Sequence, residues 1–132
     1  MLDLWVFDRC PVRLSDPRDL GHLPYNFEPP PRGGHLRIVQ SPAWPPDYVR
    51  PPMHEPRQRP GGTWDRVGSI VHKTATVDYG IVLEGERLLI LDDRELLMRP
   101  GDVVVQLGNW HGWGNPTTPS RMAFIMLGAT FA

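Results

Sequence analysis

Two histidines and a carboxylate lie in two short, strand-like segments of this 132-residue chain, each punctuated by glycine. His72 and Asp78 belong to the first segment, and His111 belongs to the second. Two imidazoles and one carboxylate are the ligand set of many divalent metal sites, because three protein ligands on one side leave coordination positions open on the other. We therefore predict that His72, Asp78 and His111 bind one divalent transition metal such as Zn, Fe, Ni or Mn.

The residues around this set include further groups that can bind or transform a substrate. In a strand, residues two apart share a face, so His72, Thr74, Thr76 and Asp78 would line one side. That face lines either a polar cavity or solvent. Within this region we predict two sets of site residues. The catalytic candidates are Asp78, His111 and Tyr79; the substrate-binding candidates are Thr74, Gln106, Trp110 and Trp113.

The segments that must position these groups are short strands separated by glycine- and proline-containing turns. No stretch of ten residues has a clear helical period, so we predict an all-β sandwich or barrel. Residues 103–106 form a continuous apolar run that is typical of a buried strand. The predicted strands are residues 4–7, 36–40, 63–69, 70–76, 79–83, 87–91, 95–98, 103–106 and 121–127.

The chain changes composition near residue 61. Thirteen of its sixteen prolines lie within residues 1–60, and proline excludes both a long helix and a central strand. The same half is rich in aromatic and aliphatic residues, which gain from burial. We predict an ordered proline-rich arm with short strands over residues 1–61, wrapping the domain or a partner, and a barrel over residues 62–132, with Gly61–Gly62 as the hinge.

The composition argues against a nucleic-acid or membrane partner. The formal net charge is −1 with interspersed charges, which does not match the basic face of a nucleic-acid-binding protein. No apolar run approaches the roughly 18 residues of a membrane span, and the acidic first residues do not resemble a secretory leader. The single Cys10 cannot form an intrachain disulfide and fits a reducing cytoplasm. We expect a cytoplasmic protein with a small-molecule ligand and no nucleic-acid or membrane partner. His22, His35 and His54 are expected at the surface.

Both motif segments resemble those of the cupin superfamily. His72-x-Thr74-x3-Asp78-x6-Gly85 is similar to the first cupin motif, and Gly101-Asp102 through His111-x3-Asn115 to the second. In particular the chain resembles small single-domain cupins that carry His-x-Thr-x-Thr-x-Asp-Tyr in the first motif. The resemblance covers roughly residues 62–130. It implies a jelly-roll barrel with a metal held inside by both motifs, and homodimers are common among small cupins.

Two positions depart from the family pattern. Thr74 stands where the first motif usually has its second histidine, and Asp78 stands where it usually has glutamate. The site is then either a three-ligand facial triad or one that has lost its metal. We expect a metal-dependent enzyme that transforms a small, partly apolar carbonyl or phenolic compound by proton transfer, as a lyase or isomerase catalysing dehydration, decarboxylation or isomerisation. The alternatives are an Fe(II)-dependent dioxygenase, a non-catalytic small-molecule-binding cupin and a merely packed barrel.

Overall fold

The computed structural model describes residues 1–60 and 62–132, and within them it has eleven strands and no helix. Gly61, half of the predicted hinge, lies outside the described residues. The part of the chain that is described contains no helix long and apolar enough to cross a membrane. The strands are β1 (Leu2–Phe7), β2 (Gly34–Ser41), β3 (Pro56–Gln58), β4 (Trp64–Arg66), β5 (Val71–Lys73), β6 (Thr76–Gly85), β7 (Arg87–Ile90), β8 (Glu95–Met98), β9 (Val103–Leu107), β10 (His111–Gly114) and β11 (Ser120–Gly128).

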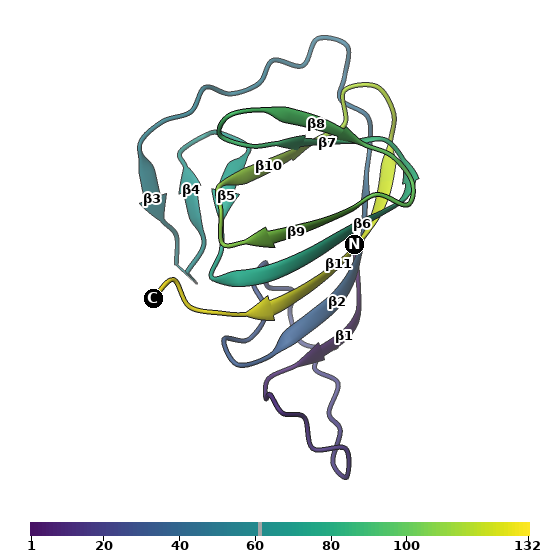
Figure 1. Ribbon diagram of the computed structural model, residues 1–132, viewed down its shortest axis with the longest axis vertical. Coiled ribbons are helices and arrows are strands. Elements are labelled where there is room, and N and C mark those ends of the chain that lie inside the picture. The colour runs from purple at the N-terminus through teal and green to yellow at the C-terminus, as the bar shows by residue number, and fades with distance from the viewer. Residues whose placement is uncertain (61) are drawn as a thin grey trace.

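Two antiparallel sheets face each other and form the barrel (Figure 1). One sheet has five strands in the order β1-β2-β11-β6-β9, and the other has six in the order β3-β4-β5-β10-β7-β8. The long strands β6 and β11 pair along nearly their whole length at the centre of the first sheet. The all-β jelly-roll barrel predicted from the sequence is confirmed. Strands from both sides of residue 61 pair within each sheet, and the domain boundary there stays a prediction.

Every predicted strand overlaps a strand of the structure, but β3 and β10 were not predicted. Strand β3 begins at Pro56 and lies at a sheet edge, where a missing backbone donor is tolerated. Strand β10 contains Gly112 and Gly114, and glycine is depleted in strands. Both sequences therefore lack the local pattern by which a strand is recognised.

Apolar side chains fill one end of the space between the sheets. Val82, Leu89, Met98 and Met122 form this core, with Trp113 and Phe124 packed against it. Along β6 the inward positions change from Thr76 and Asp78 to Val82, so the barrel is polar at one end and apolar at the other. Burying apolar groups stabilises the fold and leaves the polar end available for a site.

The prediction that residues 103–106 form a buried strand is wrong. Strand β9 lies at the edge of the five-stranded sheet, and its side chains alternate. Val103 and Val105 are 58% and 49% exposed, whereas Gln106 points inward and is buried. A continuous apolar run does not say which face of an edge strand will be covered.

Part of the proline-rich half covers the outer face of the six-stranded sheet. Figure 1 shows the segment after β2 running around this sheet before it returns as β3. Trp44 from that segment packs against the cluster of Val71, Leu88 and Ile90. The contact needs a glycine at position 114, because a Cβ there would lie 2.4 Å from Cζ2 of Trp44.

The remainder of the proline-rich half folds against the open end of the barrel. Arg37 on β2 anchors it: its guanidinium lies 2.5 Å from the carboxylate of Asp3 and donates hydrogen bonds to the carbonyl oxygens of Asn26 and Phe27. Tyr25 adds a cation–π contact, 4.5 Å from the guanidinium carbon to the ring centre. Within the predicted proline-rich arm of residues 1–61, residues 20–31 are the part that lies here, and from this point 'the arm' means residues 20–31 only. The buried cation fixes it at the mouth of the barrel.

Candidate functional site

His72 and His111 lie side by side inside the barrel. Strand β10 pairs with β5 so that His111 is directly opposite His72. The centres of the two imidazole rings are 4.6 Å apart and their planes make an angle of 63°. Opposite residues of an antiparallel pair project to the same face, so the pairing itself brings the two rings together.

Both imidazoles are held in the neutral form that can bind a metal. Burial and the neighbouring His111 lower the pKa of His72 to about 4, and burial also lowers the pKa of His111. Nδ1 of His111 lies 2.9 Å from the carbonyl oxygen of Asn109. A carbonyl only accepts hydrogen bonds, so Nδ1 carries the proton and Nε2 keeps its lone pair. Such a backbone partner fixes the tautomer of metal-binding histidines.

Asp78 faces the same cavity from the five-stranded sheet. It is 5% exposed, and its Oδ1 accepts a 2.6 Å hydrogen bond from the hydroxyl of Thr76. That hydroxyl lies 2.5 Å from the hydroxyl of Thr74. Burial raises the pKa of Asp78, while Thr76 and His111 oppose the rise. A carboxylate with a raised pKa is a suitable proton acceptor near neutral pH.

These three residues line a cavity of about 220 Å³. The volume is below the roughly 300–1,000 Å³ of sites for drug-sized ligands, so the cavity suits a small molecule. Aromatic rings supply much of the wall, and the arm contributes two of them. The lining residues are Met1, Tyr25, Phe27, Arg37, Val39, Ile70, His72, Asp78, Arg87, His111, Trp113, Phe124 and Met126.

A groove on the outside of the barrel meets this cavity at His72. The groove, about 690 Å³, runs between the arm and strands β4 and β5. Phe27, Ile70 and His72 line both the groove and the cavity. The ring of Phe27 packs edge-on against His72, with 5.1 Å between ring centres. Phe27 therefore stands between the site and the outside.

The family resemblance implies a metal, and the side chains of the cavity include the donor types that such a metal needs. Across residues 1–60 and 62–132, no three His, Cys, Asp or Glu side chains are spaced as a complete metal centre. The paired neutral imidazoles with free lone pairs, together with Asp78 in the same cavity, nevertheless have the donor chemistry that a divalent transition metal takes. The donors fit a metal, and the three-ligand site remains a proposal.

The other predicted site residues are placed differently. Trp113 lines the cavity, with 6.1 Å between its ring centre and that of His111. Tyr79 is on the outward face of β6 and is 38% exposed. Trp110 packs on the cluster of Val71, Leu88 and Ile90.

Thr74 and Gln106 are buried beside the cavity. Thr74 is 1% exposed and reaches Asp78 only through Thr76. Gln106 is opposite Asp78 in the pairing of β6 with β9, and its Oε1 accepts a hydrogen bond from Asn109. Neither Thr74 nor Gln106 is among the described residues that line the cavity.

Sequence reasoning missed three contributors to the inner surface. Arg87 lines the cavity, and the only local signal was a charged residue at the head of an apolar strand. Phe27 comes from the arm, whose path no local pattern reveals. His35 was expected at the surface and that was wrong: it is 2% exposed on the inner face of β2. His22 and His54 are exposed, as expected.

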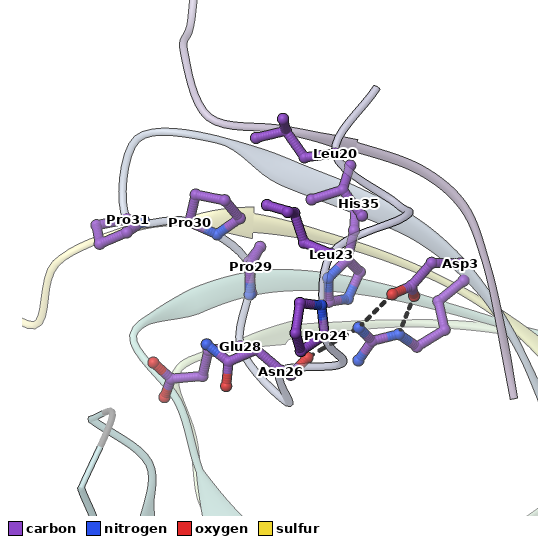
Figure 2. A pocket seen from close by; sticks show the side chains of 12 residues that line it. Asp3, Leu20, Leu23, Pro24, Asn26, Glu28, Pro29, Pro30, Pro31 and His35 are labelled. Carbon is purple, nitrogen blue, oxygen red and sulfur yellow. Dashed lines mark hydrogen bonds and ion pairs between the residues drawn. The ribbon is translucent and has the colours of Figure 1, made fainter. Parts of the chain in front are cut away.

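His35 belongs to a second cavity, about 490 Å³, between the arm and the inner face of β2. Figure 2 shows His35, Leu23 and the proline run Pro29, Pro30 and Pro31 among the side chains that line this cavity. Nε2 of His35 makes no hydrogen bond with the described residues. Burial and Arg37 lower the pKa of His35 to about 4, so it is neutral at pH 7.

Part of the chain is similar in sequence to cupin-domain proteins. No family model matches the chain. The chain is 44% identical over 66 residues to the cupin-domain-containing oxidoreductase fogC of Aspergillus ruber, covering 46% of this chain and 32% of that protein. It is 48% identical over 64 residues to the cupin-domain-containing oxidoreductase virC of Hypocrea virens, covering 45% and 33%. The chain spans about a third of the length of these relatives.

Among solved structures, a cupin protein from Bacteroides fragilis is similar with a TM-score of 0.48 and 14% identity, covering 75% of this chain and 69% of that one. The identity to cupin-domain relatives over about half of this chain, together with the two-sheet barrel, supports the resemblance to the cupin superfamily.

Proposed function

We propose that this chain forms the catalytic barrel of a small metal-dependent cupin enzyme that acts on a small, partly apolar carbonyl or phenolic compound. The observation that carries the proposal is the pairing of neutral His72 and His111 in a cavity that also holds Asp78. In this proposal His72, His111 and Asp78 hold one divalent metal. When bound, the metal supplies Lewis-acid polarisation of a substrate oxygen.

The protein's own groups suit proton transfer. Asp78 or one of the two histidines would move the proton from a carbon or oxygen next to a polarised carbonyl; burial raises the pKa of Asp78, which suits this role when its carboxylate is not bound to the metal. Thr76 donates a hydrogen bond to Oδ1 of Asp78 and so fixes which oxygen faces the cavity. The rings of Phe27, Trp113 and Phe124 favour a flat substrate, and Phe27 limits access of water from the outer groove. This arrangement supports dehydration, decarboxylation or isomerisation as the proposed reaction.

A second candidate is an oxidoreductase that uses Fe(II) and oxygen; the two relatives are named oxidoreductases, without a metal or oxidant. Two histidines and one carboxylate are also the ligand set of non-haem Fe(II) oxygenases. The two candidates share the metal and the cavity and differ in the need for oxygen.

The first experiment measures metal content by mass spectrometry. We expect one divalent metal per chain in the wild type and none in the double variant His72→Ala/His111→Ala. The exposed pair His22→Ala/His54→Ala is the matched control and should keep full occupancy. Full occupancy in His72→Ala/His111→Ala would show that the assignment is wrong.

The second experiment separates the reactions. The protein is reconstituted with Fe(II) or Zn(II) and offered aromatic and β-dicarbonyl compounds with and without oxygen. Turnover with Zn(II) in the absence of oxygen supports proton transfer, whereas turnover only with Fe(II) and oxygen supports the oxidoreductase. Tight ligand binding without turnover would assign the chain to the non-catalytic binders.

A further inference from the structure

Arg87 introduces a positive charge into the cavity that the protein does not neutralise. It is the first residue of β7, it lines the cavity and it is 9% exposed. Within the described part of the chain, no Asp or Glu forms an ion pair with it. Asp78 lines the same cavity, but its recorded hydrogen bond is with Thr76.

Neutral groups hold the guanidinium in place. Nη1 donates hydrogen bonds to Oδ1 of Asn115 at 2.7 Å and to the hydroxyl of Ser120 at 3.2 Å. Asn115 is itself fixed, because its Nδ2 donates to the carbonyl oxygens of Glu86 and Thr118 and to Ser120. The position of the guanidinium is therefore fixed while its charge is left uncompensated.

One donor of the guanidinium is buried without a partner. Its Nε has no hydrogen-bond partner among the described residues. Removing a charge from water without a partner is costly, and a buried donor without an acceptor adds to that cost. Burial lowers the pKa of Arg87 only to about 10, so the group remains charged at pH 7. A buried cation that the fold holds without a counter-ion is stabilised when a ligand supplies one.

We propose that Arg87 binds the carboxylate of a small planar substrate in this cavity. Two parallel hydrogen bonds from a guanidinium match the two oxygens of a carboxylate. Trp113 is close to both Arg87 and His111: the guanidinium carbon lies over its ring at 5.7 Å, and its ring centre is 6.1 Å from that of His111. A flat molecule on this ring would place its carboxylate at Arg87 and its other end near His72 and His111. The proposal deepens the proposed function by naming the substrate class and rests on the same cavity.

The test compares benzoate with benzamide, its neutral counterpart of nearly equal shape, by calorimetric titration of the metal-free protein. We expect benzoate to bind about 10- to 100-fold more tightly, as one charge-assisted contact allows. Arg87→Met should lose this preference, and Arg87→Lys, which keeps the charge, should retain part of it. A preference that survives in Arg87→Met overturns the proposal, as does the absence of measurable benzoate binding to the wild type at millimolar concentration.

A second variant does not depend on how Arg87→Met folds. Asn115→Asp places a carboxylate where Oδ1 already accepts from Arg87, but it also loses the Nδ2 donations to Glu86, Thr118 and Ser120, so its melting temperature is measured beside its binding. It should abolish the preference for benzoate while benzamide binds as before; an unchanged preference contradicts the proposal. Inorganic phosphate is the third ligand, and equal binding of phosphate and benzoate would overturn the assignment to a carboxylate.

The proposed metal site and the proposed carboxylate contact at Arg87 can be rejected independently of each other. The double variant His72→Ala/His111→Ala should still prefer benzoate, because Arg87 and Asn115 are unchanged. If the wild type binds no metal but keeps the benzoate preference, the proposed enzyme is wrong and the carboxylate contact stands. If metal binds with full stoichiometry but benzoate and benzamide bind equally, the carboxylate contact is wrong and the metal site stands.

Discussion

His72 and His111 lie directly opposite each other on β5 and β10, with 4.6 Å between their ring centres. Each comes from a different motif, and neither motif alone contains the pair. The fold brings them together by a short antiparallel pairing in which Gly112 is opposite Val71. The site therefore depends on the register of β10.

The first prediction concerns the hydroxyl that holds Asp78. Thr76→Val removes the hydrogen bond to Oδ1 and keeps the shape of the side chain. Because partners of ligating groups orient them, metal affinity should fall by about 10- to 100-fold, measured by competition with a chelator. Thr63→Val is the matched control, since Thr63 bonds Glu28 and lines the outer groove but not the cavity, so the affinity should not change. Unaltered affinity in Thr76→Val would argue that Asp78 does not bind the metal.

The sequence predicts those site residues whose positions follow from strand alternation or from motif spacing. Alternation along β6 places Thr76 and Asp78 on the inner face, and the motif spacing identifies His72 and His111. Thr76 and Asp78 need only their own strand to be correct, whereas His111 was identified from the motif although its strand β10 was not predicted. Strand positions also follow from turns marked by residues such as Gly85, whose φ of +72° favours glycine.

The parts that sequence could not reveal depend on distant contacts. Phe27 reaches His72 only because Arg37 ties the arm to the barrel. Arg87 looks like an ordinary surface charge until Asn115 fixes it beside the cavity. Strand β9 looked buried because neither the edge position nor the missing cover over Val105 is encoded locally.

The second prediction concerns stability against acid. The pKa of His35 is lowered from 6.5 to about 4 in the folded protein. Between these values the unfolded chain binds a proton that the folded chain does not, so acid favours unfolding. The free energy of unfolding should rise with pH across this window by up to about 1.4 kcal/mol per unit for this group and level off above it.

Urea unfolding of variants at a series of pH values checks this. His72, whose pKa is also lowered to about 4, adds to the same slope. His35→Leu should therefore reduce the slope without removing it, whereas the exposed His22→Leu should leave it unchanged. An identical slope in His35→Leu and wild type would contradict the role of His35.

The third prediction concerns the anchor of the arm. Arg37 is buried, and Asp3 is its ion-pair partner. Asp3→Ala leaves a buried unpaired cation, which should cost about 3–5 kcal/mol of unfolding free energy. Arg37→Met/Asp3→Ala should recover part of this loss, because no charge then remains. Faster proteolysis within residues 20–31 in the Asp3→Ala variant would locate the effect in the arm. Additive losses of unfolding free energy in the double variant would show that Asp3 and Arg37 are not coupled.

The fourth prediction concerns assembly. Strand β9 is an edge strand whose Val103, Val105 and Leu107 are exposed, and such edges favour pairing with another chain. We predict a homodimer, so light scattering should give twice the 15.0 kDa chain mass. Val105→Lys should shift the protein towards the monomer if β9 forms the contact. A wild-type mass of one chain at micromolar concentration would rule the dimer out.

The last prediction concerns the covering of the six-stranded sheet by Trp44. A Cβ at position 114 would lie 2.4 Å from Cζ2 and 2.6 Å from Cη2 of the indole, so one of the two must move. Gly114→Ala should cost about 1–3 kcal/mol, as overpacking does. Trp44→Leu alone should also destabilise the protein by removing contacts with the cluster under the indole.

The double variant Gly114→Ala/Trp44→Leu tests whether the two residues are in contact. With the indole gone, the added methyl of Gly114→Ala has space, so the combined loss should be smaller than the sum of the two single losses. The free energies come from urea unfolding of all four proteins. Strict additivity would show that Trp44 does not pack on Gly114. The covering segment would then need another contact to hold it over β10, the strand that carries His111.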